Sequence, residues 1–129
     1  MILVLDDDGL VSTLLDQLIR DGGDACEISA TVEDAYRRVL ERGEVFALGL
    51  IDLRIGEDNR GGLRLAEMIR GIADPTKADL PLMLMTGGMD FVAFADLASG
   101  LRLSGLLSKP FSPDGLAQAI KRYRRFPAF

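Results

Sequence analysis

The sequence predicts an α/β fold built on a doubly wound, five-stranded parallel sheet. Short apolar runs of strand length alternate five times with segments whose apolar residues recur at helical spacing. The run 47–52 is apolar on both sides of a strand, which is typical of a parallel sheet covered by helices on both faces. Right-handed crossovers are expected to join the strands.

Each expected strand is an apolar run bounded by turn-forming or acidic residues. The five runs are residues 2–5, 25–29, 47–52, 80–85 and 105–108. The run 25–29 is the least apolar, so we expect it at an edge of the sheet.

Five helices are expected between and after these strands. They cover residues 10–21, 32–42, 63–72, 91–97 and 114–125. Gly22 and Gly43 are typical helix ends, and Thr31 with an acidic residue three positions later is typical of a helix start. The polar loop 54–62 separates the third strand from the third helix.

The composition limits the classes of function. The 129 residues fit one domain, 1–129, and a net charge of −5 without a broad basic stripe disfavours nucleic acid as a direct partner. There is no His, so chemistry depends on carboxylates, Lys and hydroxyls. The single Cys26 is expected to be a buried structural thiol. Neither a leader nor a membrane span is indicated, and we expect a cytoplasmic protein.

Polar side chains follow four of the five expected strands. Asp6 and Asp7 follow the first strand, Asp52 ends the third, Thr86 follows the fourth and Lys109 follows the fifth. The carboxyl ends of parallel strands face one crevice, so we expect these side chains to converge. Three neighbouring carboxylates repel one another unless a cation lies between them, and Mg²⁺ suits such oxygen ligands. A carboxylate there could attack a phosphoryl group, with Lys109 and Thr86 contacting its oxygens.

Four segments resemble the response-regulator receiver domain of two-component signalling, and together they extend over nearly the whole chain. They are residues 2–8 (ILVLDDD), 50–53 (LIDL), 83–87 (MLMTG) and 107–111 (LSKPF). The resemblance implies a flavodoxin-like sheet of order 2-1-3-4-5 with five helices. It also implies that Asp52 accepts a phosphoryl group from a histidine kinase or phosphotransfer protein.

The resemblance further assigns roles around Asp52. Asp7, Asp52 and the backbone carbonyl of Arg54 would bind Mg²⁺, with Asp6 helping through water, while Thr86 and Lys109 would contact the phosphoryl oxygens. The bond between Lys109 and Pro110 is expected to be cis. Such a protein catalyses its own phosphorylation and dephosphorylation but is not expected to turn over a separate substrate.

Some positions depart from the family pattern. Gly56 stands where a proline usually follows the acceptor by four residues, and the loop 56–62 is about two residues longer than usual. Leu106 occupies the position of the aromatic switch residue, and Gly87 replaces the commoner alanine after Thr86. With Leu106 at that position, phosphorylation is expected to cause only a small rearrangement near Thr86 and in segment 89–97.

Two other functions stay open at this point. One is a receiver-shaped interaction module that is never phosphorylated, which Gly56 and Leu106 keep in consideration. The other is a haloacid-dehalogenase-type phosphatase, because Asp6-Asp7-Asp8-Gly9 resembles its D-x-D-G motif, with Asp6 as nucleophile and Asp8 as general acid. That family expects Thr or Val after the glycine, and it leaves Asp52 without a role.

The expected partners follow from the resemblance. A downstream protein target is expected on the face of the fourth helix, fifth strand and fifth helix, where Phe91, Phe94 and Phe126 either dock a partner or pack in the core. No output domain is expected after the last helix, and we expect a monomer or weak dimer without membrane contact.

Overall fold

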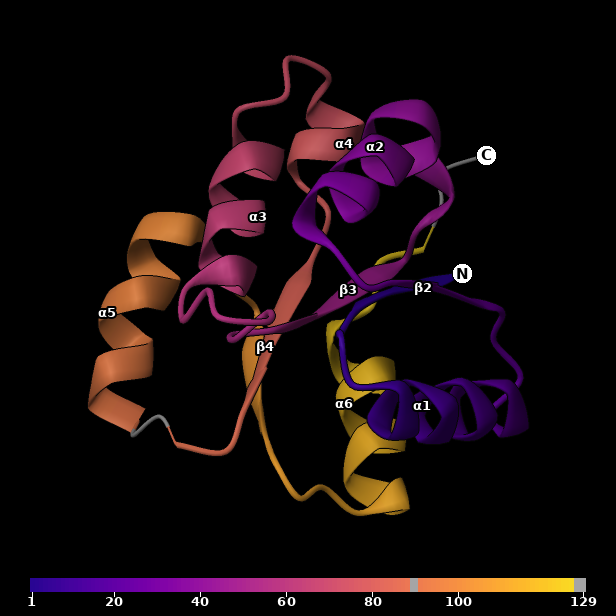
Figure 1. The fold of residues 1–129 in the computed structure, drawn as a ribbon. Helices are drawn as coiled ribbons and strands as arrows, with labels where there is room; N and C mark the ends of the chain where they lie inside the picture. Colours follow the sequence, from indigo (N-terminus) through magenta and orange to yellow (C-terminus); the bar gives the residue numbers. More distant parts are fainter. Residues whose placement is uncertain (89–90, 127–129) are drawn as a thin grey trace.

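The computed structural model describes residues 1–88 and 91–126, without the side chain of Phe91. Five parallel strands form one sheet in the order β2-β1-β3-β4-β5, so the predicted fold class and strand order are confirmed (Figure 1). The strands are β1 (Ile2–Leu5), β2 (Cys26–Ser29), β3 (Leu48–Asp52), β4 (Leu82–Thr86) and β5 (Gly105–Ser108).

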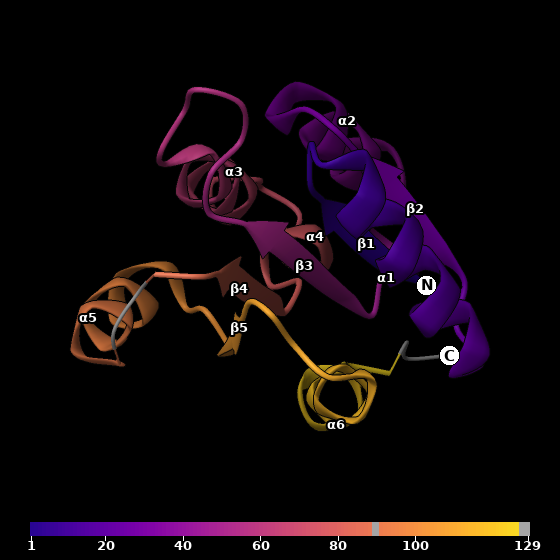
Figure 2. The ribbon, with the colours of Figure 1, turned by 60° about the horizontal axis from the view of Figure 1, so that its bottom comes forward.

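Helices connect the strands and cover both faces of the sheet. They are α1 (Gly9–Asp21), α2 (Val32–Arg42), the 3₁₀ turn η1 (Gly43–Val45), α3 (Gly61–Arg70), α4 (Pro75–Ala78), α5 (Phe91–Leu101) and α6 (Pro113–Tyr123). Helices α1 and α6 lie on one side of the sheet, and α2, α3 and α5 lie on the other (Figures 1 and 2). Of the helices in the described ranges, none is long and apolar enough to cross a membrane.

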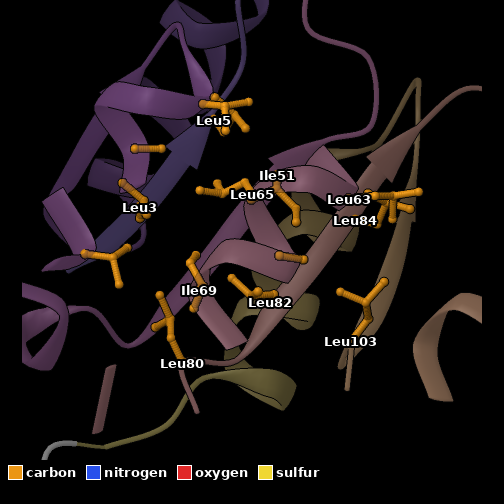
Figure 3. Close-up of a cluster of buried hydrophobic side chains, with 14 of the residues drawn as sticks. Leu3, Leu5, Ile51, Leu63, Leu65, Ile69, Leu80, Leu82, Leu84 and Leu103 are labelled. Atoms are coloured by element: carbon orange, nitrogen blue, oxygen red, sulfur yellow. The ribbon is translucent and has the colours of Figure 1, made fainter. Parts of the chain in front are cut away.

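Alternate residues of each strand point into two separate apolar clusters. Leu3 and Leu5 pack toward α2, α3 and α5, while Ile2 and Val4 pack toward α1 and α6. Figure 3 shows the first of these clusters, in which side chains of β1, β3 and β4 meet the inner side of α3. Full burial of each such side chain stabilises the fold by roughly 1.5–3 kcal/mol. Burial on both sides explains why the central strands are apolar throughout.

The helix boundaries differ from the predicted ones where capping residues act. The described residues contain six helices instead of five, because Asp74 accepts the N–H of Thr76 and caps the additional short helix α4, which has Pro75 at its first position. Helix α5 is four residues longer than expected. Helix α6 ends at Tyr123, because Arg124 already has extended backbone angles.

The strand register brings the polar strand ends to one level. Leu5 pairs with Ile51 in neighbouring strands, so the following residues, Asp6 and Asp52, lie side by side. In the other pair of strands, Thr86 of β4 pairs with Ser108 of β5. Lys109, which follows Ser108, therefore lies just beyond the same edge. The sheet itself therefore delivers these side chains to its carboxyl edge.

Candidate functional site

Asp6 is a buried carboxylate at the end of β1, with 1% of its surface exposed. One oxygen accepts the backbone N–H of Asp8 at 2.9 Å, and the other accepts the ammonium of Lys109 at 3.2 Å. A buried charge needs such partners, because an unpaired carboxylate in the interior is strongly unfavourable. Asp6 therefore supplies a fixed negative charge beneath the site.

Asp52 and Lys109 form the central pair of the site. The Lys109 ammonium lies 3.0 Å from Oδ2 of Asp52. The backbone N–H of Lys109 donates to the carbonyl of Thr86 at 3.0 Å. The side chain of Asp52 is 13% exposed and that of Lys109 is 24% exposed. The bond between Lys109 and Pro110 is cis, as expected. The ammonium thus bridges two carboxylates from adjacent strands.

The surroundings of this pair raise the pKa of both side chains. Burial raises the pKa of Asp52, and the Lys109 ammonium opposes this only in part. Burial alone would lower the pKa of Lys109, but hydrogen bonds and charges from Asp52 and Asp6 outweigh it and the pKa is raised. The two shifts therefore have different main causes, burial for Asp52 and the neighbouring carboxylates for Lys109.

Asp7 completes a group of three carboxylates. Single oxygens of Asp6, Asp7 and Asp52 all lie within 4.8 Å of one another. Asp7 is exposed, and its Oδ2 accepts the backbone N–H of Gly56 at 2.7 Å. The donor set consists of hard oxygen atoms with an unneutralised charge, which fits Mg²⁺ and not a soft metal. Arg54, the expected carbonyl ligand, lies on the wall of the same cleft.

The site opens into a cleft of about 830 Å³ at the carboxyl edge of the sheet. Asp7, Asp52, Thr86 and Lys109 line it, whereas Asp6 lies below its floor. The hydroxyl of Thr86 is half-buried and accepts the N–H of Gly88 at 3.3 Å. All the expected site residues are therefore brought together, and the carboxylate of Asp52 is partly accessible from solvent.

Two groups of the site were not identified from the sequence. The N–H of Gly56 contacts Asp7, and Asn59 lines the cleft. Gly56 has a positive φ of 58°, and a glycine in a polar loop signals such a conformation but not the atom it faces. Asp8 also lines the cleft, and its Oδ1 caps α1 by accepting the N–H groups of Leu10 and Val11. The cap gives Asp8 a structural role in α1, whereas the phosphatase alternative assigns it the role of general acid and leaves Asp52 without one.

The residues expected at the switch and docking positions lie as follows. Leu106 is half-buried and packs against the cluster beneath α5. Phe94 is buried in that cluster, so it packs in the core. Phe126 is 77% exposed. The side chain of Phe91 and residues 89–90, which belong to the segment expected to rearrange, lie outside the described part.

Solved structures of receiver proteins superimpose on nearly the whole chain. The chemotaxis protein CheY4 of Vibrio cholerae gives a TM-score of 0.82 at 18% identity, covering 95% of this chain and 96% of that chain. A response regulator receiver protein from Pseudomonas putida gives 0.78 at 25% identity, with 94% of both chains covered. The receiver domain of NtrX from Brucella abortus gives 0.79 at 20% identity, with 95% and 96% covered.

The sequence itself also matches a family model. No curated protein matches the chain. The model of the response regulator receiver domain matches residues 2–121, a range that contains every residue of the site described above. The chain therefore belongs to the response regulator receiver domain family of two-component signalling proteins.

Proposed function

We propose that the protein accepts a phosphoryl group on Asp52 from the phosphohistidine of a histidine kinase or phosphotransfer protein. The observation that carries this proposal is the position of the Lys109 ammonium, between Asp52 and the buried Asp6 at the floor of an open cleft. Such an arrangement leaves part of the carboxylate accessible from the cleft while placing positive charge where phosphoryl oxygens would lie.

The reaction forms one bond and breaks another. A carboxylate oxygen of Asp52 attacks phosphorus, and the bond from phosphorus to the imidazole nitrogen breaks. The electron pair returns to that nitrogen, which takes up a proton from water. Lys109 and the hydroxyl of Thr86 then contact the transferred phosphoryl oxygens. Positioning and charge neutralisation account for the catalysis, because the chain offers no imidazole as a proton carrier.

The metal site proposed for this reaction uses the carboxylates of Asp7 and Asp52 and the carbonyl of Arg54, with Asp6 acting through water. When bound, Mg²⁺ neutralises negative charge on the transferring phosphoryl oxygens. Its fit to this chain is supported by the three carboxylate oxygens that lie within 4.8 Å of one another.

Acetyl phosphate with Mg²⁺, followed by intact-mass measurement, tests the proposal. We expect one added phosphoryl group in the wild type, removed by hydroxylamine as an acyl phosphate would be, and none in Asp52→Asn. Chelation of divalent ions should abolish the modification. A wild-type chain that stays unmodified would favour the receiver-shaped interaction module instead.

Phosphorylation is proposed to shift a conformational balance that partners detect. Leu106 already packs against the core, so the shift would involve Thr86 and α5 rather than rotation of a side chain of β5. The output face proposed for a downstream protein comprises α5, β5 and α6, in a cytoplasmic monomer or weak dimer. Amide NMR spectra with and without beryllofluoride test this, and unchanged signals around Thr86 and α5 would refute it.

A further inference from the structure

The loop that follows the acceptor strand contains a closed turn. Ile55 and Asp58 exchange two backbone hydrogen bonds, each 2.9 Å long. Gly56 lies at the corner of this turn with a φ of 58°, a conformation that glycine adopts without steric cost. The backbone between Ile55 and Asp58 is therefore fixed by its own hydrogen bonds.

Side chains attach this turn to the neighbouring helices. The carboxylate of Asp58 accepts the backbone N–H of Arg60 at 2.9 Å and pairs with the guanidinium of Arg64, on α3, at 2.8 Å. Arg64 also reaches Glu33 of α2 at 3.3 Å. Exposed pairs of this kind contribute little stability individually. Their geometric effect is to hold the turn against α3 and α2.

The anchored turn presents its corner amide to the metal site. The N–H of Gly56 donates to Oδ2 of Asp7 at 2.7 Å, which is short for an N–H to oxygen bond and typical of a charged acceptor. Within residues 1–88 and 91–126, no other donor contacts this carboxylate. Asp7 is exposed, so without this bond its side chain would be free to change rotamer.

We propose that the backbone amide of Gly56 is a positioning group that holds Asp7 in its metal-binding orientation before the metal arrives. The hydrogen bond does not withdraw Asp7 from the site, because an oxygen of Asp7 lies within 4.8 Å of those of Asp6 and Asp52 while the bond is present. A carboxylate has about four lone-pair positions, so one N–H leaves others for a metal. The inference rests on the Mg²⁺ site of the proposed function.

The hydrogen bond to Asp7 requires at position 56 a glycine, or another residue that tolerates a positive φ and has a backbone N–H. A proline at position 56 would have no N–H to donate and could not adopt a φ of 58°. The replacement of the family's usual proline by glycine therefore introduces a donor to a metal ligand.

The experiment replaces the Gly56 amide by an ester, using glycolic acid at position 56, and measures Mg²⁺ binding by titration calorimetry. An ester at Asp58 is the control for the turn. The Gly56 ester weakens the bond between the Asp58 N–H and the Ile55 carbonyl, and the Asp58 ester removes it, but only the Gly56 ester removes the donor to Asp7. Partners of this kind typically change metal affinity by 10- to 100-fold, so we expect a loss of about tenfold at Gly56 and less than about twofold at Asp58.

Each outcome bears on the inference. If the Gly56 ester binds Mg²⁺ as tightly as the wild type, the role of the Gly56 amide is overturned while the proposed metal site stands. Equal losses of Mg²⁺ affinity in the two esters would have the same meaning. A wild type that binds no Mg²⁺ would overturn both the inference and the metal site. Gly56→Asn keeps the N–H and tolerates positive φ, so it should retain Mg²⁺ affinity close to that of the wild type, whereas Gly56→Pro should lose it. Circular dichroism of each metal-free protein checks that the fold is kept.

Discussion

Replacing Lys109 by Met removes the one ammonium that bridges Asp6 and Asp52 while keeping an unbranched side chain of similar length. The two carboxylates then remain partly or fully buried without their cation. We expect the free energy of unfolding to fall, because the uncompensated charges are present only in the folded state.

The magnitude follows from the two ion-pair distances. At 3.0 and 3.2 Å, an effective dielectric constant of about 20 gives a gross attraction of about 5 kcal/mol for each pair. Desolvation of the three groups offsets much of this attraction, and removing one partner of a buried pair typically costs about 3–5 kcal/mol. Because Lys109 is 24% exposed, we expect the lower limit, about 3 kcal/mol at pH 7 without divalent ions.

The loss should depend on pH in a defined direction. Without Lys109, the raised pKa of Asp52 rises further, so the folded state binds a proton that the unfolded chain releases above about pH 4. The stability of the variant relative to the wild type therefore falls as the pH increases from about 4 through the raised pKa of Asp52. The difference between the two proteins should be largest at pH 7 and should shrink toward pH 4.

Urea unfolding followed by circular dichroism measures these differences, with Lys121→Met as the control. Lys121 is exposed on α6, so its removal changes the net charge equally but should cost less than about 0.5 kcal/mol. Excess Mg²⁺ should stabilise Lys109→Met more than the wild type, because the metal no longer competes with the ammonium. A loss below about 1 kcal/mol, or one that is equal at pH 4 and pH 7, would refute the reasoning.

Three other features lead to predictions. A Cβ on Gly62 would lie 2.2 Å from the carbonyl oxygen of Asp52, so Gly62→Ala should cost about 3 kcal/mol by urea unfolding, whereas Gly100→Ala, with open space, should cost nothing. Arg70 donates to the backbone carbonyls of Ala78, Leu80, Leu101 and Arg102. Arg70→Met should therefore lower the free energy of unfolding by about 3 kcal/mol and accelerate amide exchange at the end of α5. Burial raises the pKa of Cys26 to about 11, so iodoacetamide at pH 8 should modify it only after denaturation.

The sequence was sufficient to predict the sheet because each central strand is a short apolar run that helices cover on both sides. It was also sufficient to bring Asp6, Asp52, Thr86 and Lys109 to one edge, since these residues follow strands whose ends align. The additional helix α4 was missed because its signal is local, an Asp74 cap before a proline, in a segment too short to show an apolar period.

Contacts made by backbone atoms in loops could not be predicted in the same way. The sequence marks Gly56 as permissive but does not state which side chain its N–H faces, because that depends on the closed turn and on the pair between Asp58 and Arg64. Likewise Asp8 is one of three consecutive acids, and its role as the cap of α1 depends on where the helix begins.

The sheet thus positions the ammonium of Lys109, whereas the loop positions the amide of Gly56. The effects of these two groups on stability and on metal binding can therefore be measured separately. Lys109 bridges charges that the sheet buries, so its removal must change the free energy of unfolding as well as metal binding. The Gly56 amide contacts an exposed carboxylate, which water would solvate if the bond were lost, so its removal changes stability little. Its effect should appear chiefly in Mg²⁺ affinity, because the bond selects one orientation of Asp7 among several that the folded chain permits.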